Sequence, residues 1–169
     1  MTNIILIGMM GSGKTTVGQA LAQKISYRFV DTDKIIEEMQ GLSITDIFKL
    51  HGESHFREIE VNTLEKLKHL SQTVISTGGG IVLNPLNTIQ LKAMGIVIYL
   101  RGSVRQLKEN IGETDETRPM LQAYSMETIL QVRSSLYEQT AAIVIDIDGK
   151  SMKDIVEEIS LEILRFDAI

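Results

Sequence analysis

Residues 8–15 read Gly8-Met9-Met10-Gly11-Ser12-Gly13-Lys14-Thr15, a stretch that satisfies the pattern G-x-x-x-x-G-K-[ST] in full. It directly follows residues 3–7, a short apolar run with β-branched side chains, and an amphipathic segment over 14–25 follows it. Strand, glycine-rich loop and helix, in this order, form the context in which the motif binds a polyphosphate. The stretch therefore predicts a nucleotide-binding loop between the first strand and the first helix.

Each residue type in this loop has a physical role toward a polyphosphate. Glycines let successive backbone N–H groups turn inward, and the helix N-terminus adds a partial positive charge. We expect Lys14 to reach the terminal phosphates and the Thr15 hydroxyl to ligate Mg²⁺. The predicted nucleotide contacts in the loop are Gly11, Ser12, Gly13, Lys14, Thr15 and Thr16. The alternative is a glycine turn that caps a helix and leaves Lys14 in solvent.

Apolar, strand-like runs alternate with helical patterns along the rest of the chain. The runs cover residues 4–7, 28–30, 73–76, 96–100 and 142–146. The helical patterns lie near 14–25, 33–40, 43–50, 54–70, 86–93, 103–110, 125–140 and 151–165. Buried strands that are each followed by a helix predict an α/β fold with a parallel sheet covered on both faces. Ligands of such sheets bind beyond the carboxyl ends of the strands.

Composition limits the possible functions. The 169 residues are 43% hydrophobic and fit one globular domain, with no apolar run long enough to cross a bilayer. The formal net charge of −5 disfavours a nucleic-acid partner, which needs a basic face. The sequence has no cysteine, which excludes disulfides and thiolate chemistry. We expect a cytoplasmic protein without a signal peptide, and a monomer at this size.

Polar residues follow two of the strand-like runs. Asp31 and Asp33 come after the second run, and in an extended segment side chains at i and i+2 point the same way. One carboxylate could hold Mg²⁺ and the other could orient an acceptor hydroxyl, whereas the simpler alternative is that Asp33 only caps a helix. Three glycines at 78–80 follow the third run and suit a close approach of the backbone to a ligand.

Three arginines carry further information. Arg133 interrupts an apolar stripe on the helix near 125–140, so it needs a carboxylate or an anionic ligand as its partner. If Arg57 reached the same pocket, the two guanidinium groups would favour a carboxylate. Arg118 lies in the polar segment 111–123, a candidate lid, and could close over a transferring phosphoryl group. A surface ion pair is the alternative for each.

Several other features are predicted to be structural. Ser43 and Asp46 form a capping box. The three histidines at 51, 55 and 69 lack metal-ligand spacing and are expected at the surface or in helix packing. Asp146 ends a strand-like run that resembles a second nucleotide-binding motif, but a peripheral strand is the favoured interpretation.

Taken together, the motifs resemble the shikimate kinase family along nearly the whole chain. The first matching segments are residues 8–15, Asp31-Thr32-Asp33 and Phe56-Arg57-Glu58. The others are residues 76–80, Arg118-Pro119-Met120-Leu121, and Arg133 followed by Leu136-Tyr137. The loop at 8–15 is specific by itself, and the set is specific through its order and spacing.

The resemblance implies a nucleoside-monophosphate-kinase-like fold with three α/β/α layers. Its five-stranded parallel sheet has the order 2-3-1-4-5, in one domain over 1–169 with an acceptor region near 31–62 and a lid near 111–123. It also implies transfer of the ATP γ-phosphate to the 3-hydroxyl of shikimate, giving shikimate 3-phosphate and ADP, a step of aromatic amino acid biosynthesis.

The resemblance also implies a role for each matching residue. Shikimate would bind to Asp33, Arg57, Gly79, Gly80 and Arg133, with the two arginines on its carboxylate. Asp33 would also assist deprotonation, while Lys14 and Arg118 would stabilise charge on the phosphoryl group. Mg²⁺ would be served by Thr15 and Asp31.

Two departures from the family pattern concern the nucleotide side. Members often carry an arginine against adenine where this chain has Ile111, and the lid holds acidic residues at 113, 115 and 116. Alternative functions are another small-molecule kinase, such as a gluconate kinase, or a non-catalytic nucleotide-binding homologue. A nucleoside monophosphate kinase and a GTPase are disfavoured because their signature segments are missing.

Overall fold

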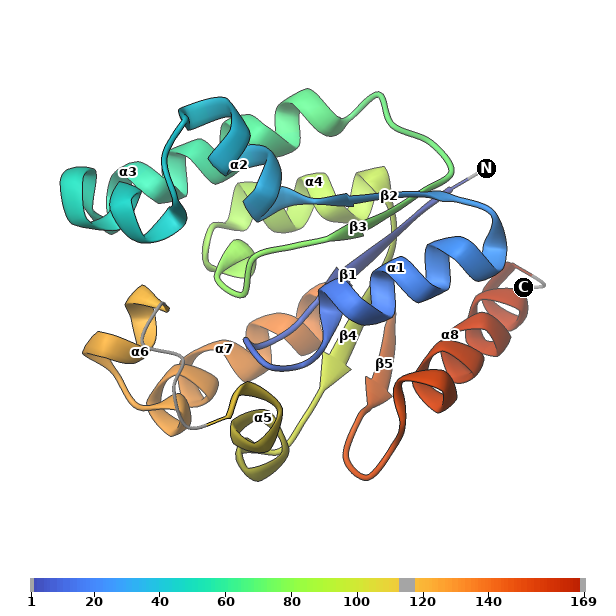
Figure 1. Ribbon diagram of the computed structural model, residues 1–169. Coiled ribbons are helices and arrows are strands. Elements are labelled where there is room, and N and C mark those ends of the chain that lie inside the picture. The colour runs from blue at the N-terminus through green and yellow to red at the C-terminus, as the bar shows by residue number, and fades with distance from the viewer. Residues whose placement is uncertain (1, 113–117, 168–169) are drawn as a thin grey trace.

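Five short strands form a single parallel sheet in the computed structural model, which describes residues 2–112 and 118–167 (Figure 1). The strands are β1 (Asn3–Ile7), β2 (Arg28–Asp31), β3 (Thr73–Ser76), β4 (Gly95–Arg101) and β5 (Ile143–Asp146). Their order is β2-β3-β1-β4-β5, as the family resemblance implied. The order reverses at β1, so the chemistry of this fold is expected at the carboxyl end of β1 and its neighbours.

Helices cover both faces of the sheet, which makes a three-layer α/β/α fold. On one face α1 (Lys14–Ile25) packs against α8 (Met152–Asp167), and on the other lie α4 (Pro85–Met94) and α7 (Met126–Thr140) (Figure 1). Beyond β2, α2 (Thr32–Gln40) packs on α3 (Ile44–Leu67), which also contacts α4. The remaining helices are η1 (Ile81–Leu83), α5 (Val104–Ile111) and α6 (Pro119–Ala123).

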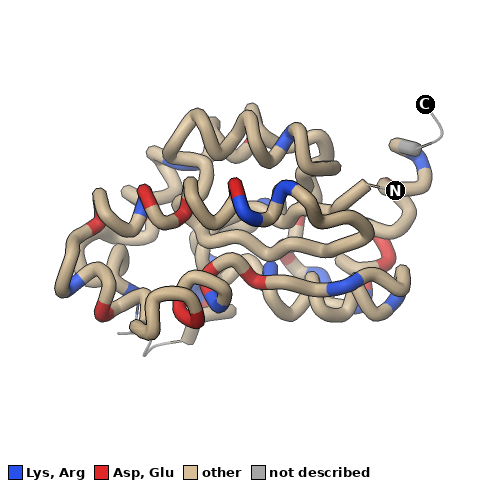
Figure 2. The backbone as a smooth tube through the Cα atoms, turned by 90° about the horizontal axis from the view of Figure 1, so that it is seen from above, with Lys and Arg blue, Asp and Glu red and all other residues tan. Residues whose placement is uncertain are grey.

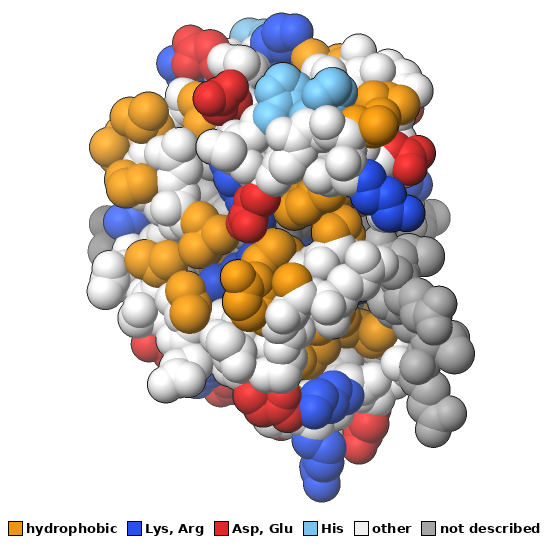
Figure 3. Space-filling view, turned by 90° about the vertical axis from the view of Figure 1, so that its left-hand side faces the viewer, with side chains coloured by type: hydrophobic (Ala, Val, Ile, Leu, Met, Phe, Trp, Pro, Cys, Tyr) orange, Lys and Arg blue, Asp and Glu red, His pale blue; other side chains and the backbone are white. Residues whose placement is uncertain are grey.

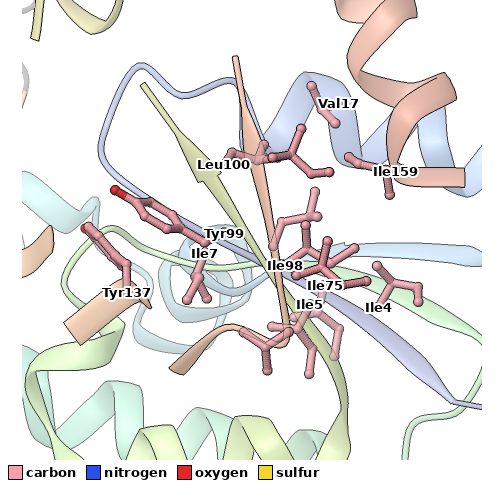
Figure 4. Packing of buried hydrophobic residues seen from close by; sticks show 14 of the residues in the cluster. Ile4, Ile5, Ile7, Val17, Ile75, Ile98, Tyr99, Leu100, Tyr137 and Ile159 are labelled. Atoms are coloured by element: carbon pink, nitrogen blue, oxygen red, sulfur yellow. The ribbon is translucent and has the colours of Figure 1, made fainter. Parts of the chain in front are cut away.

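The central strands are buried because both faces of the sheet are covered. Every residue of β1 and β3 is buried, whereas the edge strand β5 alternates buried and exposed positions. Ile5 and Ile75 lie side by side on one face of the sheet, whereas Ile98, which pairs with Leu6, belongs to the other face (Figure 4). Continuous burial of β-branched side chains explains why the inner strands read as unbroken apolar runs in the sequence.

The helix boundaries match the sequence expectations with one difference. The two helices expected at 43–50 and 54–70 are confirmed, because α3 consists of two helical parts that meet at a kink, where Gly52 has a non-helical backbone conformation of φ 82° and ψ 171°. The segment 111–123, expected to be loop-like, contains the short helix α6 after Arg118. Residues 113–117 of the predicted lid lie outside the described residues. Of the described helices, none combines the length and the apolar character that crossing a membrane requires.

Acidic and basic positions are spread along the described backbone and do not gather on one side of the molecule (Figure 2). Half of the expected capping box is present: Ser43 accepts a hydrogen bond from the Asp46 N–H at 3.1 Å, but the described residues show no return bond from the Ser43 N–H to the Asp46 side chain. Several of the charged residues singled out from the sequence nevertheless lie close together at the carboxyl ends of the strands.

Candidate active site

A cavity of about 680 Å³ opens beyond the carboxyl ends of β1, β2 and β3. It lies between α2 and α3 on one side and α6 and α7 on the other, and Figure 3 shows this side of the molecule, with basic side chains between hydrophobic ones. Most residues predicted from the sequence line it together. These are Gly11, Gly13, Lys14, Thr15, Thr16, Asp31, Asp33, Arg57, Gly79, Gly80, Arg118 and Arg133.

Ser12 differs from the other predicted loop residues. It is buried and is not part of the cavity lining, and its hydroxyl lies 3.4 Å from the Lys14 amine. Its backbone N–H donates to the Met9 carbonyl, which stabilises the turn of the loop. Ser12 therefore shapes the loop and supports Lys14 rather than facing the cavity with its side chain.

Lys14 begins α1 and lies folded back over the loop. Its amine donates to the carbonyls of Gly8 at 2.8 Å and Met9 at 2.9 Å. Burial lowers its pKa to about 8, against the attraction of Asp33, and the nearby Arg118 lowers the pKa further. The alternative of a solvated lysine is wrong, because the charge is held inside the loop, where terminal phosphates would replace carbonyl oxygens as its partners.

Thr15 and Asp31 form a hydroxyl–carboxylate pair at the cavity wall. The Thr15 hydroxyl donates to Asp31 Oδ2 at 2.8 Å, while Asp31 Oδ1 accepts the N–H of Asp33 at 3.0 Å. Asp31 is thus the N-cap of α2, a role that the sequence alternative gave to Asp33. The two oxygens are donors of the type that Mg²⁺ prefers, and they lie next to the loop.

Asp33 lies in the first turn of α2 with a strongly perturbed carboxyl group. Its Oδ1 is buried without a hydrogen-bond partner among the described residues. Burial, followed by the negative charges of Asp31 and Glu60, raises the pKa of Asp33 to about 7. The two aspartates share the cavity as predicted, although the extended backbone assumed for them ends at Asp31. An unpaired carboxylate of raised pKa facing a cavity is suited to accept a proton.

The glycines at 78–80 form the floor against which three polar side chains rest. A Cβ at Gly78 would lie 2.7 Å from Asp33 Oδ1, and one at Gly79 would lie 3.2 Å from Arg133 Nη1. At Gly80 a Cβ would lie 2.3 Å from Arg57 Nη1. Any larger residue in this loop would therefore displace a cavity side chain, while the close approach of this backbone to a ligand stays a prediction.

Arg57 and Arg133 meet at the cavity from α3 and α7. Arg57 donates to the buried Glu60 at 2.6 Å and to Glu53 at 3.2 Å, yet its Nε remains buried without a partner among the described residues. Arg133 is 2% exposed, and no carboxylate of the described residues lies within 4.0 Å of it. The pair thus leaves guanidinium donors available to an anionic group in the cavity.

Glu60 was not identified from the sequence. It is 1% exposed, and burial raises its pKa even though Arg57 opposes this shift. The available indication was its position three residues after Arg57, on the buried face of α3 that also holds Phe56, Ile59 and Leu64. An acid on that face predicts an ion pair with the nearest arginine.

The lid side of the cavity is built from α5 and α6. Arg118 is the N-cap of α6, is half-buried and lines the cavity. The Asn110 side chain donates to the Gly11 carbonyl at 2.8 Å, and Ile111 packs where a Cβ of Gly11 would lie. Ile111, which replaces a frequent family arginine, therefore packs against the phosphate-binding loop.

The features predicted to be structural lie outside this cavity. Asp146 forms a two-point ion pair with Arg101, with distances of 2.6 and 2.9 Å. His51, His55 and His69 are exposed, and the first two rings contact each other at 4.9 Å. The described residues hold no cluster of three or more His, Asp or Glu side chains that could bind a metal.

Comparison with known proteins decides the family. A family model described as shikimate kinase matches residues 10–164. The chain belongs to the shikimate kinase family. A shikimate kinase of Caldanaerobacter subterraneus subsp. tengcongensis is 40% identical over 163 residues, covering 94% of each chain. One of Sulfurihydrogenibium sp. is 41% identical over 167 residues, covering 98% of this chain and 99% of the other. The chain is therefore a phosphotransferase of the kinase type.

Solved structures agree with this assignment. Shikimate kinase from Acinetobacter baumannii in complex with shikimate superposes with a TM-score of 0.93 at 35% identity, covering 98% of this chain and 94% of the other. A gluconokinase from Sinorhizobium meliloti reaches a TM-score of 0.55 at 20% identity, which shows a shared fold only. The family assignment thus favours the first sequence interpretation over a gluconate kinase.

Proposed function

We propose that this enzyme transfers the γ-phosphoryl group of ATP to the 3-hydroxyl of shikimate, giving shikimate 3-phosphate and ADP. The observation that carries the proposal is the convergence of Arg57 and Arg133 with Asp33 on the glycine floor at 78–80, opposite the phosphate-binding loop. A cavity that offers guanidinium donors and a basic carboxylate fits a small hydroxy acid.

On the acceptor side, each polar group has one task. The Arg57 and Arg133 guanidinium groups bind the carboxylate of the acid, which fixes the ring in the cavity. Asp33 accepts the proton of the reacting hydroxyl as its oxygen forms a bond to the γ-phosphorus. The bond between that phosphorus and the bridging oxygen breaks, and ADP carries away the electron pair.

On the nucleotide side, the loop at 11–16 binds the phosphates through its backbone N–H groups. Lys14 leaves the carbonyls of Gly8 and Met9 and donates to the terminal phosphate oxygens, while Arg118 closes over the transferring group. Both cations stabilise negative charge that spreads over these oxygens as the bonds change. The proposed lid near 111–123 would exclude water from this step.

Thr15 and Asp31 would hold Mg²⁺, because their paired oxygens lie at the cavity wall beside the loop. The ion supplies charge neutralisation between the phosphates when it is bound. We also infer a monomer acting in the cytoplasm without a nucleic-acid partner, from the size of the chain, its lack of cysteine and its formal net charge of −5.

The direct test measures ADP release with ATP, Mg²⁺ and a panel of hydroxy acids that includes shikimate and gluconate. We expect ADP release to depend on shikimate and to remain at background with gluconate. ADP release with gluconate and not with shikimate would favour a gluconate kinase. ADP release that needs no acid would point to a nucleotide-binding homologue without this activity.

Replacing Arg133 tests the acceptor site separately. Arg133→Met keeps a long side chain but removes a buried charge, so acceptor binding should weaken by about 2–5 kcal/mol while ATP affinity changes less than about twofold. Steady-state kinetics and nucleotide titration measure both quantities. Arg101→Met is the matched control, because Arg101 forms an exposed ion pair away from the cavity. Unchanged kinetics with shikimate in Arg133→Met would remove Arg133 from the acceptor site.

A further inference from the structure

Hydrogen bonds from neighbouring elements hold the glycine floor at 78–80 in place. One of them comes from a residue that has no part in the chemistry proposed above. Thr77 donates to the Leu6 carbonyl at 2.9 Å, and Thr32 accepts the Gly78 N–H at 3.2 Å. The third bond comes from Tyr137, whose hydroxyl donates to the Gly79 carbonyl at 2.5 Å. This bond ties the floor to α7.

Tyr137 is held in place by its surroundings. Its side chain is fully buried, and its ring stacks on that of Tyr99 with centroids 4.9 Å apart and an angle of 29° (Figure 4). Tyr99 belongs to β4 and pairs with Ile7, the residue before the phosphate-binding loop. Burial raises the pKa of Tyr137 to about 12, so the phenol remains a donor at any working pH. Its position is therefore fixed by the sheet itself.

The direction of one peptide plane follows from this bond. In a trans peptide the C=O of one residue and the N–H of the next point to opposite sides. Because Tyr137 binds the Gly79 carbonyl, it also sets where the Gly80 N–H points. That N–H makes no hydrogen bond within the described part of the chain, and Gly80 lines the cavity next to Arg57.

We propose that Tyr137 is a positioning residue for the acceptor, which acts by fixing the Gly79–Gly80 peptide plane so that the Gly80 N–H is presented to the bound hydroxy acid. Arg133 lies one helical turn before Tyr137 on α7 and rests against Gly79. Tyr137 thus sets the distance between this guanidinium and the floor as well. The inference rests on the proposed function, because it assumes an acid in this cavity.

Tyr137→Phe tests the proposal, since it keeps the ring and its stacking and removes the hydroxyl, which bonds to the Gly79 carbonyl and also interacts with Arg133. We expect the KM for shikimate to rise about tenfold, with kcat and the KM for ATP within about twofold of the wild type. Tyr99→Phe is the matched control: it removes the same atom from the stacked partner, which has no bond to the floor. Its shikimate KM should stay unchanged.

A purely structural role would give a different result. It would lower the melting temperature or the active fraction and leave the shikimate KM of the folded enzyme unchanged, which would overturn the proposal. An equal rise of KM in Tyr99→Phe would also overturn it. If wild-type enzyme shows no activity with shikimate, the proposed function fails, whereas an active wild type with an unaffected Tyr137→Phe refutes this inference alone.

Incorporation of p-aminophenylalanine at 137 provides the rescue, because it restores a weaker donor at the same place. Its shikimate KM should fall between those of the wild type and Tyr137→Phe. If Tyr137→Phe does not fold, p-fluorophenylalanine at 137 carries the test, because its fluorine takes the place of the hydroxyl without donating: a shikimate KM above that of the wild type supports the proposal, and an identical KM contradicts it.

Discussion

Asp33 shows how the cavity changes the chemistry of a single residue. An ordinary aspartate is ionised and a weak base at neutral pH. Here burial and the nearby carboxylates of Asp31 and Glu60 bring its pKa to about 7. Near neutral pH the group therefore exists in both protonation states and is a stronger base when ionised.

This shift predicts the pH dependence of the reaction. The ionised form of Asp33 is the one that accepts a proton, so kcat/KM for shikimate should rise with pH and level off above about 7. A pH–rate profile measures this limb. Asp33→Asn should lose most of the activity and show no limb near pH 7. A profile that is flat from pH 5 to 8 in the wild type would contradict the assignment of Asp33 as the base.

Residue identities were the most predictable part of the site, for a physical reason. Arg133 on an apolar stripe and the aspartates after a strand break local patterns that the fold otherwise requires. Glu60 and Tyr137 were not predicted as site residues. For Glu60 the spacing from Arg57 on the buried face of α3 was an available indication, whereas a tyrosine on an apolar stripe breaks no pattern. The role of Tyr137 depends on which partner lies opposite, and a single sequence does not contain that information.

At the scale of the elements, the kink in α3 confirms the two helices that the sequence predicted around residue 52. The two helical parts meet at Gly52, whose backbone is non-helical. At φ 82° and ψ 171°, Gly52 occupies a region open essentially to glycine alone, although a Cβ there would have free space. The glycine is required by the backbone and not by packing.

Gly52→Ala should therefore destabilise the fold by about 1–3 kcal/mol, although it improves the helix propensity of the sequence. Urea unfolding measures the change. Gly41→Asn is the control, because Gly41 ends α2 in the left-handed conformation that asparagine tolerates, and its cost should be only about a few tenths of a kcal/mol. Equal costs for both variants would show that the Gly52 conformation carries no special strain.

The two helices that the sequence analysis did not predict are short. Neither η1 nor α6 has enough residues to produce a periodic pattern, so both lie in stretches that read as loops. The strands and longer helices were predictable because burial on both faces of the sheet leaves continuous apolar runs and amphipathic helices between them. Their boundaries agree within a few residues.

At the scale of the whole molecule, the site makes the ligand-free fold less stable. A carboxyl group whose pKa rises from 3.8 to about 7 on folding binds protons better in the folded state between these values. The free energy of unfolding therefore falls as pH rises from about 4 to 7, and the loss is complete above pH 7. The raised pKa that makes Asp33 a better base therefore also makes the ligand-free enzyme less stable.

Asp33→Asn should reverse this loss. We expect the variant to be more stable than the wild type at pH 8 by about 2–4 kcal/mol, with the difference vanishing near pH 4. Melting curves across this range measure it. Asp154→Asn is the control, because Ser151 donates to that exposed carboxylate and lowers its pKa, so no stability should be gained at pH 8. If the stability difference between Asp33→Asn and the wild type were the same at every pH, packing and not the charge of Asp33 would be its cause.

The glycine floor also has a consequence for how acceptor preference can change. The three polar groups on it, Asp33, Arg57 and Arg133, come from three separate helices, α2, α3 and α7, and can mutate independently. An enzyme that evolves toward a different acid can therefore change one of these three side chains at a time. The glycines at 78–80 stay fixed, because a side chain there would displace one of the three polar groups. Laboratory evolution toward new acceptors should therefore accumulate substitutions in the three helices and leave the triplet of glycines intact.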